Sequence, residues 1–180
     1  MKTSLKEKIL TIHSQISEFQ NSENMSMEFH VDCDLEDRLK FIYAAIFPGT
    51  KKMQFYFRFF LSRIAYFTDY SPLKVLIYRI CGVKIGKGVF ISPQVFIDVH
   101  FPSFLIIEDY AILGINSYIF QHDFINNKYR IGKVKIKRGA LVGAFAKIRC
   151  GVTVGKEANI AADSLVLKDV PDFFKPSKYD

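Results

Sequence analysis

The chain has 180 residues, of which 49% are hydrophobic and 24% are charged, and its formal net charge at pH 7 is +7. This length predicts one domain with an appendage, and the composition is sufficient for a substantial core. The positive charge favours an anionic partner, but no run of five or more basic residues occurs, so a nucleic-acid partner is not expected.

Cysteine usage and hydropathy indicate the compartment. Cys33, Cys81 and Cys150 are odd in number, widely spaced and without a C-x-x-C pair, which argues against a disulfide framework. The first ten residues lack the apolar run of a signal peptide, and no stretch reaches the ~18 apolar residues of a membrane span. We therefore expect a cytoplasmic protein, and we leave open a contact with the inner face of the membrane.

Residues 1–82 are predicted to form a helical segment that caps the rest of the chain. Apolar residues recur at helical spacing between residues 5 and 19 and predict an amphipathic helix. Residues 20–34 are polar and rich in turn formers. A second helix is expected over residues 35–47, before Pro48 and Gly49.

Two more helices are expected before residue 83. Residues 51–68 carry seven aromatic side chains among four basic ones. Ser71 is the predicted N-cap of the following helix, with Pro72 at its first position and Gly82 after its end. We interpret the aromatic segment as a hydrophobic cap over the open end of a repeat structure, although its basic residues also favour peripheral membrane contact through residues 51–68.

Residues 83–171 follow a six-residue period. Twelve blocks each begin with an aliphatic residue, and the fifth position is small or Val in ten of them. This period predicts a parallel β-helix with about four coils of three blocks, in which the aliphatic residues stack into interior columns. The blocks begin at Ile85, Ile91, Ile97, Ile107, Leu113, Ile119, Ile136, Val142, Ile148, Val154, Ile160 and Val166.

Two interruptions of the period are predicted to project from one corner of this prism. Residues 103–106 and the loop 125–135 each follow the third block of a coil. Residues 172–180 are expected to form a short tail. Gly and Asp at second positions of blocks are expected to suit tight corners; they are Gly86, Asp98, Gly114, Gly143 and Gly155.

The corner beside the longer loop contains the candidate catalytic group. Stacking predicts that His100 lies one coil below His122, and His122 immediately precedes the loop. An imidazole beside a loop that leaves a rigid scaffold is suited to catalysis, although an ordinary surface histidine fits the position as well. Because the repeat contains only these two histidines, and catalytic zinc needs three ligands, we expect no metal.

From Leu73 to Pro171 the chain resembles the hexapeptide-repeat acyltransferases. The stretch LKVLIYRICGVKIGKGVFISP is similar to the beginning of the repeat in sugar O-acetyltransferases of surface-polysaccharide biosynthesis, and GALVGAFAKIRCGVTVGKEANIAADSLVLKDVP is similar to the family's end. The resemblance implies a mainly β fold, a left-handed parallel β-helix, and a homotrimer with active sites between subunits. It also implies transfer of an acetyl group from acetyl-CoA as co-substrate to a hydroxyl of a polysaccharide, oligosaccharide or nucleotide sugar. N-acetylation of an amino sugar or antibiotic, and a non-enzymatic membrane-associated scaffold, remain alternatives.

The resemblance also implies roles for individual residues. His122 matches the catalytic base, and Asp98 matches an acid that binds the acceptor. His100 and Asp123 lie at the same corner and are further candidates for acceptor binding, while the group that orients His122 is left open. The candidate coenzyme positions include Gly143, where a small residue would let the pantetheine arm approach the backbone; they are Gly143, Ala144, Ala162, Leu167 and Lys168.

Overall fold

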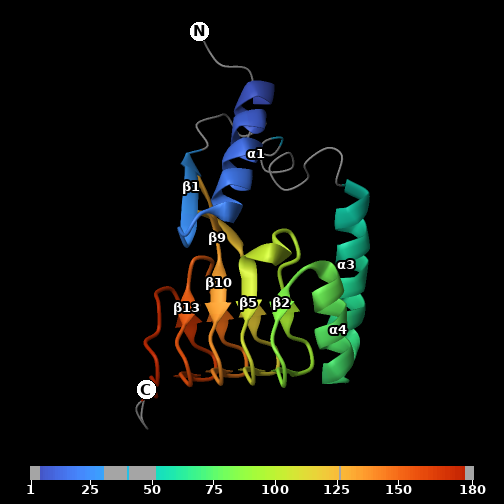
Figure 1. The fold of residues 1–180 in the computed structure, drawn as a ribbon, viewed down its shortest axis with the longest axis vertical. Helices are drawn as coiled ribbons and strands as arrows, with labels where there is room; N and C mark the ends of the chain where they lie inside the picture. Colours follow the sequence, from blue (N-terminus) through green and yellow to red (C-terminus); the bar gives the residue numbers. More distant parts are fainter. Residues whose placement is uncertain (1–4, 31–39, 41–51, 126, 177–180) are drawn as a thin grey trace.

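The computed structural model describes residues 5–30, 40, 52–125 and 127–176 of the chain. The helix expected over residues 35–47 lies outside the described residues, apart from Lys40, which is helical. Helices α3 and α4 stand side by side at one end of a stack of coils, and α1 lies above that stack (Figure 1). Within residues 5–30, 52–125 and 127–176 the helices are α1 (Leu5–Asn21), α3 (Lys52–Phe67), α4 (Ser71–Cys81) and the short 3-10 helix η2 (Pro102–Phe104).

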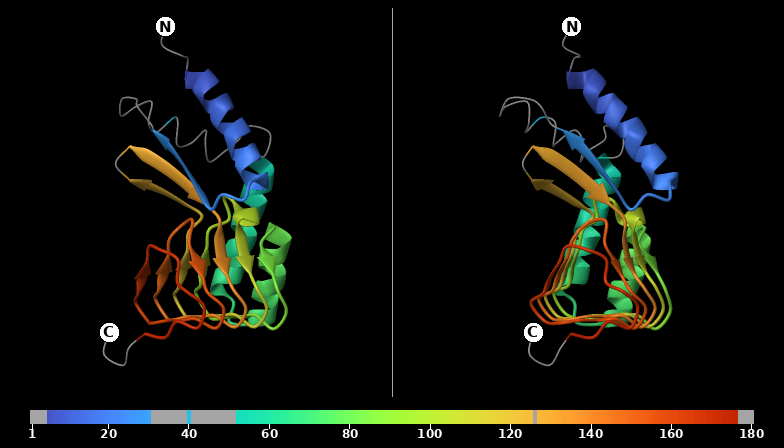
Figure 2. Two further views of the ribbon diagram at one scale, coloured as in Figure 1. Left: turned by 60° about the vertical axis from the view of Figure 1, so that its left-hand side comes forward. Right: turned by 90° about the vertical axis from the view of Figure 1, so that its left-hand side faces the viewer.

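Residues 84–166 form a parallel β-helix of triangular cross-section (Figure 2). Each face of the prism is a four-stranded parallel sheet, and every coil contributes one strand to each face. The first face contains β2 (Lys84–Ile85), β5 (Leu105–Ile107), β10 (Val134–Ile136) and β13 (Thr153–Val154). The second contains β3 (Phe90–Ile91), β6 (Ile112–Leu113), β11 (Leu141–Val142) and β14 (Asn159–Ile160). The third contains β4 (Phe96–Ile97), β7 (Tyr118–Ile119), β12 (Lys147–Ile148) and β15 (Leu165–Val166).

The register confirms the predicted columns. Ile97, Ile119, Ile148 and Val166 are aligned strand to strand on the third face, and the other two faces show the same alignment of block starts. Apart from the partly buried Ile85, these side chains are buried, together with the fifth-position residues of the first three coils that are small or Val. The hydrophobic period therefore sets the register, since any slip by one residue would turn the aliphatic side chains outward.

Three of the second-position glycines begin corner turns, as expected, since the carbonyls of Gly114, Gly143 and Gly155 accept the backbone N–H three residues later at 3.1, 3.3 and 3.3 Å. The corners are turned at the fourth position, where Phe145 and Asp163 have φ angles of 62° and 60°. A Cβ on Gly143 would lie 2.6 Å from the backbone nitrogen of Ala162 in the next coil. The lack of a side chain at Gly143 therefore permits close contact between coils, and its predicted role at the coenzyme stays a prediction.

Gly143→Ala is expected to lower the free energy of unfolding by about 1–3 kcal/mol, because the added methyl group meets backbone that cannot move aside. Urea unfolding measures the change. Ala161→Ser is the matched control, since Ala161 has the same block position in the last coil and already carries a Cβ. Unchanged stability with a raised KM for the coenzyme would instead support the predicted ligand-binding role of Gly143.

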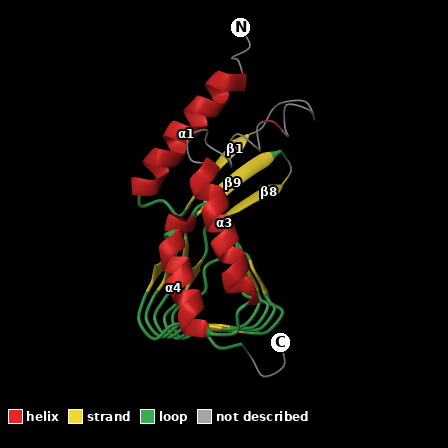
Figure 3. Ribbon diagram, turned by 90° about the vertical axis from the view of Figure 1, so that its right-hand side faces the viewer, coloured by secondary structure: helices red, strands yellow, loops and turns green. Residues whose placement is uncertain are grey.

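Helix α4 covers the first coil, whereas the sequence suggests the preceding aromatic segment for this position (Figure 3). Its side chains bond to backbone groups that the first coil would otherwise leave unpaired. Lys74 Nζ donates to Ser92 O at 2.6 Å, Tyr78 Oη donates to Val95 O at 3.3 Å, and Arg79 donates to Ile85 O at 2.9 Å. Lys74 is fully buried, and burial lowers its pKa. The cap thus satisfies a strand edge as well as covering the apolar interior.

The predicted N-cap of α4 is one residue too late. The N-cap is Tyr70, which makes no side-chain capping bond, and Ser71 begins the helix. The Ser71 hydroxyl instead accepts a hydrogen bond from the backbone N–H of Ile91 at 2.9 Å. Gly82 ends the helix with a φ of 104°, as its position predicts.

A second, smaller core lies above the corner where the interruptions leave the prism. The longer interruption is a hairpin of β8 (His122–Ile125) and β9 (Lys128–Gly132), and β1 (Ser26–His30) pairs antiparallel with β9. Residues 20–34 were expected to be turns, so β1 is a correction. Ile12, Phe19 and Phe29 of the N-terminal segment pack against this hairpin and η2. The N-terminal segment therefore has two separate roles, because α1 and β1 hold the hairpin while α3 and α4 cap the coil.

The C-terminal residues begin a further rung on the last coil. Val170 forms a parallel bridge with Val154, and the backbone N–H of Asn159 donates to Phe174 O at 2.7 Å. The carboxylate of Asp172 accepts from the backbone N–H of Lys156 at 2.8 Å. Residues 172–174 are thus bound to the prism. None of the helices in the described part of the chain combines the length and hydropathy needed to cross a bilayer.

Candidate active site

The two histidines of the repeat meet at the corner below the hairpin. His100 follows β4 in the first coil and His122 begins β8 in the second. Their ring centroids lie 4.9 Å apart with the rings edge to face. The prediction that His100 lies one coil below His122 is therefore confirmed.

Asp98 joins the two imidazoles. One carboxylate oxygen lies 2.6 Å from His100 Nδ1 and the other lies 2.6 Å from His122 Nδ1. The same oxygens accept the backbone N–H groups of His100 at 2.9 Å and Gln121 at 3.3 Å. Asp98 is buried and both its oxygens are engaged within the chain. Its geometry is that of a group that orients His122, which the sequence left open. Asp98 and His100 also line the cavity beside His122, and their predicted contact with an acceptor stays a prediction.

The charges at this corner stabilise each other. Burial raises the pKa of Asp98, but the hydrogen bonds from His100 and His122 outweigh burial and hold that pKa well below its usual range. Burial also lowers the pKa of His122, yet the hydrogen bond and charge of Asp98 outweigh it and raise the pKa above its ordinary value. An ionised Asp98 can only accept, so His122 Nδ1 carries the proton and Nε2 presents a lone pair when the ring is neutral.

A cavity of about 780 Å³ opens beside the His122 ring. Most of its wall is apolar and comes from the outer surface of the third face and from the hairpin. Two cationic side chains, Lys147 and Arg149, lie on one side. The apolar part is formed by Phe96, Phe120, Phe124, Ile125, Leu165 and Leu167. Such a wall excludes water and strengthens the electrostatic contacts of the imidazole.

Two aromatic residues that sequence reasoning missed enclose the histidines. Tyr129 of the hairpin is buried with its ring 5.8 Å from that of His122, and burial raises its pKa so that its hydroxyl stays protonated. Phe55 of α3 lies 4.9 Å from the His100 ring. The Asn126-Asn127 pair followed by alternating polar and apolar residues is a hairpin signal that could have placed Tyr129. No local signal places Phe55, because its contact depends on how α3 packs.

Asp123 is not the group that orients the His122 ring, because Asp98 is bonded to His122 Nδ1. Asp123 pairs with Arg149 at 2.7 Å and lines the cavity, so its predicted contact with an acceptor stays a prediction. Cys150 lies 3.5 Å from Asp123. Burial, followed by the nearby charge of Asp123, raises the pKa of Cys150 to about 12. The thiol is therefore protonated at neutral pH and is a poor nucleophile.

Three of the five candidate coenzyme residues line one further cavity. Ala162, Leu167 and Lys168 border a cavity of about 530 Å³ at the end of the prism. Gly143 and Ala144 do not line it, although Ala144 O accepts the backbone N–H of Asp163 at 2.8 Å. Leu165 and Leu167 line both this cavity and the one beside His122, so the two are adjacent.

Asp98, His100 and His122 also form a group whose potential ligand atoms all lie within 4.8 Å of one another. The sequence offered two histidines, and the fold adds a carboxylate as a third potential ligand. However, the 2.6 Å separations between nitrogen and oxygen are hydrogen-bond distances, with the protons between these atoms. Ligands of one zinc ion each bind it at about 2.0–2.2 Å and surround it. The arrangement fits hydrogen bonding, and the expected absence of a metal stays a prediction.

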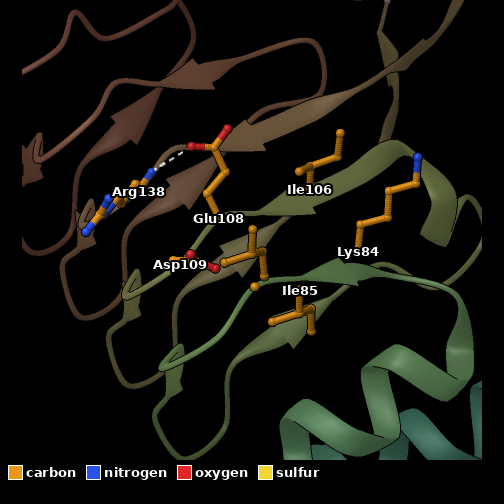
Figure 4. A pocket seen from close by; sticks show the side chains of 8 residues that line it. Lys84, Ile85, Ile106, Glu108, Asp109 and Arg138 are labelled. Carbon is orange, nitrogen blue, oxygen red and sulfur yellow. Dashed lines mark hydrogen bonds between the residues drawn. The ribbon is translucent and has the colours of Figure 1, made fainter.

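A shallower depression on the first face contains no imidazole or thiol (Figure 4). Its acidic side chains bond to backbone groups of neighbouring coils. Glu108 accepts the N–H of Arg138 at 3.0 Å, and Asp109 accepts the N–H of Lys87 at 2.8 Å. These carboxylates support turns, so the corner with His122 is the better candidate for catalysis.

Comparison with known proteins identifies the class of protein to which this site belongs. No family model matches the chain. The Bacillus subtilis protein named "Putative acetyltransferase YvoF" is 36% identical over 115 residues, which are 63% of this chain and 67% of that protein. The chain is thus similar to an acetyltransferase over about two thirds of that relative's length.

Two solved structures show the same fold at low sequence identity. The hexapeptide-repeat acetyltransferase VCA0836 of Vibrio cholerae, complexed with acetyl coenzyme A, matches with a TM-score of 0.56 and 18% identity over 69% of this chain and 82% of that one. A maltose O-acetyltransferase of Clostridium difficile 630 matches with a TM-score of 0.53 and 18% identity over 96% and 91%. With its six-residue period, its triangular coils and this similarity in sequence, the chain belongs to the hexapeptide-repeat acetyltransferases, which fold as left-handed parallel β-helices.

Proposed function

We propose that this acetyltransferase transfers the acetyl group of acetyl-CoA to a hydroxyl of a sugar, with His122 as the general base. The observation that carries the proposal is the contact of His122 Nδ1 with the buried Asp98 carboxylate. This contact fixes the tautomer that has a basic Nε2, and the ring borders an apolar cavity. The similarity to a maltose O-acetyltransferase supports a sugar as acceptor.

In this mechanism His122 Nε2 removes the proton of the acceptor hydroxyl as the oxygen attacks the thioester carbonyl. The new C–O bond forms a tetrahedral oxyanion, the C–S bond then breaks, and the departing sulfur of coenzyme A takes the proton from His122. Asp98 stabilises the imidazolium that exists between these two proton transfers. An alcohol needs such a base because it is a weak nucleophile when protonated.

The two adjacent cavities support a route for acetyl-CoA. The thioester would lie beside His122, and the pantetheine arm would pass Leu165 and Leu167 toward Ala162 and Lys168. The Lys168 ammonium is suited to a coenzyme phosphate. The complex of a protein of similar fold with acetyl coenzyme A supports this co-substrate.

We also propose a homotrimer in which a neighbouring subunit completes each site. Leu165 and Leu167 are half or more exposed on the single chain, although they line the two cavities. Apolar side chains at the mouth of a site are suited to cover by another subunit. The mass of the assembly in sedimentation equilibrium tests the trimer.

A panel of acceptors tests the choice of a sugar hydroxyl. We expect release of coenzyme A with sugars that offer hydroxyl groups alone, and mass spectrometry should show an O-acetyl ester that mild base removes. Amino sugars and aminoglycoside antibiotics form the comparison set. Turnover confined to amines, with a product stable to base, would show N-acetylation instead and refute the proposed acceptor.

A further inference from the structure

The outer face of the two capping helices is apolar and exposed. Along α3, exposed side chains follow a 4-3-4-3 spacing that places them on one stripe of the helix. Phe60 and Phe67 in this stripe are 63% and 73% exposed. The stripe consists of Met53, Phe57, Phe60, Ile64 and Phe67, and α4 adds Leu73, Leu76 and Ile80. We call these eight residues the apolar face.

The apolar face is not needed to cap the β-helix. The opposite side of α4, with Val75, Ile77, Tyr78 and Cys81, is buried against the first coil. Figures 1 and 3 show that α3 and α4 stand at the end of the prism, with their outer sides turned away from the coils. A contiguous group of large apolar side chains on the outside of a soluble fold marks a surface of contact.

The charges around the apolar face indicate which kind of partner this surface binds. Neither helix contains an Asp or Glu, whereas α3 contains Lys52, Arg58 and Arg63 and α4 contains Arg79. Lys74 of α4 is buried against the first coil and does not contribute to this surface. The nearest acid in the sequence is Asp69, in the connection between the helices. The whole chain has a net charge of +7. Apolar stripes on basic helices bind membrane interfaces, where aromatic rings enter the headgroup region and basic residues meet anionic lipids.

We propose that the apolar face of α3 and α4 rests on an anionic lipid surface. The helices lie in the headgroup region and do not cross the bilayer. Phe55, on the inner side of α3, contacts the active-site His100. Docking therefore brings the cavity beside His122 close to the lipid headgroups, where a membrane-bound acceptor is within reach. The docking itself does not depend on the identity of the base or of the acceptor.

The absence of tryptophan from the chain permits a direct test. Phe67→Trp introduces a single fluorescent reporter in the apolar face, and Leu10→Trp introduces one at a similarly exposed position of α1. On addition of vesicles of mixed phosphatidylglycerol and phosphatidylcholine, the emission of Trp at position 67 is expected to shift to the blue. The Leu10→Trp protein is expected to show no shift. An unshifted spectrum at position 67, or equal shifts at both positions, would overturn the proposal.

Sedimentation with vesicles tests the same face without a reporter. The unmodified chain is expected to pellet with the anionic vesicles, less with pure phosphatidylcholine, and less at high salt. Phe57→Glu combined with Phe60→Glu is expected to lower the partition coefficient at least about tenfold, with an unchanged melting temperature. If these substitutions instead reduce the mass of the assembly in lipid-free buffer, the face joins copies of the chain and the membrane proposal is wrong.

Discussion

His122→Ala is expected to lower kcat for acetyl transfer by about 100- to 10,000-fold, the usual contribution of a general base. The substitution removes the imidazole that Asp98 holds at the start of β8, and with it the proposed basic Nε2. It leaves the interior columns untouched, so the mass of the assembly should stay unchanged, while the loss of one partner of the buried Asp98 carboxylate should lower the melting temperature. Steady-state kinetics with acetyl-CoA and a responsive acceptor measure the loss.

His100→Ala makes this test specific, because His100 shares the Asp98 carboxylate at the same 2.6 Å distance. We expect this variant to retain more activity than His122→Ala, since His100 packs against Phe55 and lies one coil further from the hairpin. His30→Ala controls for loss of an exposed imidazole outside the site. If His100→Ala abolished transfer while His122→Ala retained it, the base would be His100. Near-normal turnover of the His122 variant would remove His122 from the mechanism.

Asp98→Asn is expected to have the second largest effect, lowering kcat by about 100-fold or more because it removes the group that fixes the imidazole tautomer. The amide nitrogen of Asn can donate to His122 Nδ1, which favours the tautomer with its proton on Nε2. That tautomer cannot take a proton from the acceptor. The variant also removes a buried negative charge that faces two imidazoles, so a lower melting temperature should accompany the loss.

The pH profile separates this orienting role from a loss of stability. His122 acts as a base only when neutral, so kcat/KM should decrease as the pH falls and the imidazole becomes protonated. Because Asp98 raises the pKa of His122, the midpoint of this acid limb should lie above the ordinary histidine value of about 6.5. In Asp98→Asn the burial of His122 remains while the raising interaction is lost. The acid limb should therefore move to lower pH. An acid limb that stayed in place, with only the amplitude reduced, would show that Asp98 does not set the pKa of the base.

The same carboxylate links the site to folding. The pKa of Asp98 is depressed in the folded chain, so the ionised group stabilises the fold above about pH 4, near the ordinary pKa of Asp, and this contribution is lost as the pH falls through the depressed value. His122 has a raised pKa and contributes in the opposite sense, with stability lost as the pH rises through that value. The dyad is therefore both a catalytic device and a local support for the corner.

The β-helix was predictable because its determinants are local and repeated. Each aliphatic block start faces the interior whichever coil it belongs to, so counting in sixes predicts the register of Ile97, Ile119, Ile148 and Val166. The same counting stacks His100 below His122. Predictions were less accurate where they required knowing which group a residue contacts, rather than its position in the six-residue period. The Ser71 hydroxyl bonds to Ile91 rather than capping its own helix.

The sequence by itself determined the repeat and the corner that contains His122, because periodicity fixes which side chains turn inward and which position precedes the loop. Only the tertiary structure decided what surrounds that imidazole. Asp98 is 24 residues away and reaches His122 through the stacking of two coils. Tyr129 comes from a hairpin that β1 holds in place, and Phe55 from a helix at the end of the prism. These contacts depend on how separate elements pack, and a pattern along the chain contains no information about distances between them.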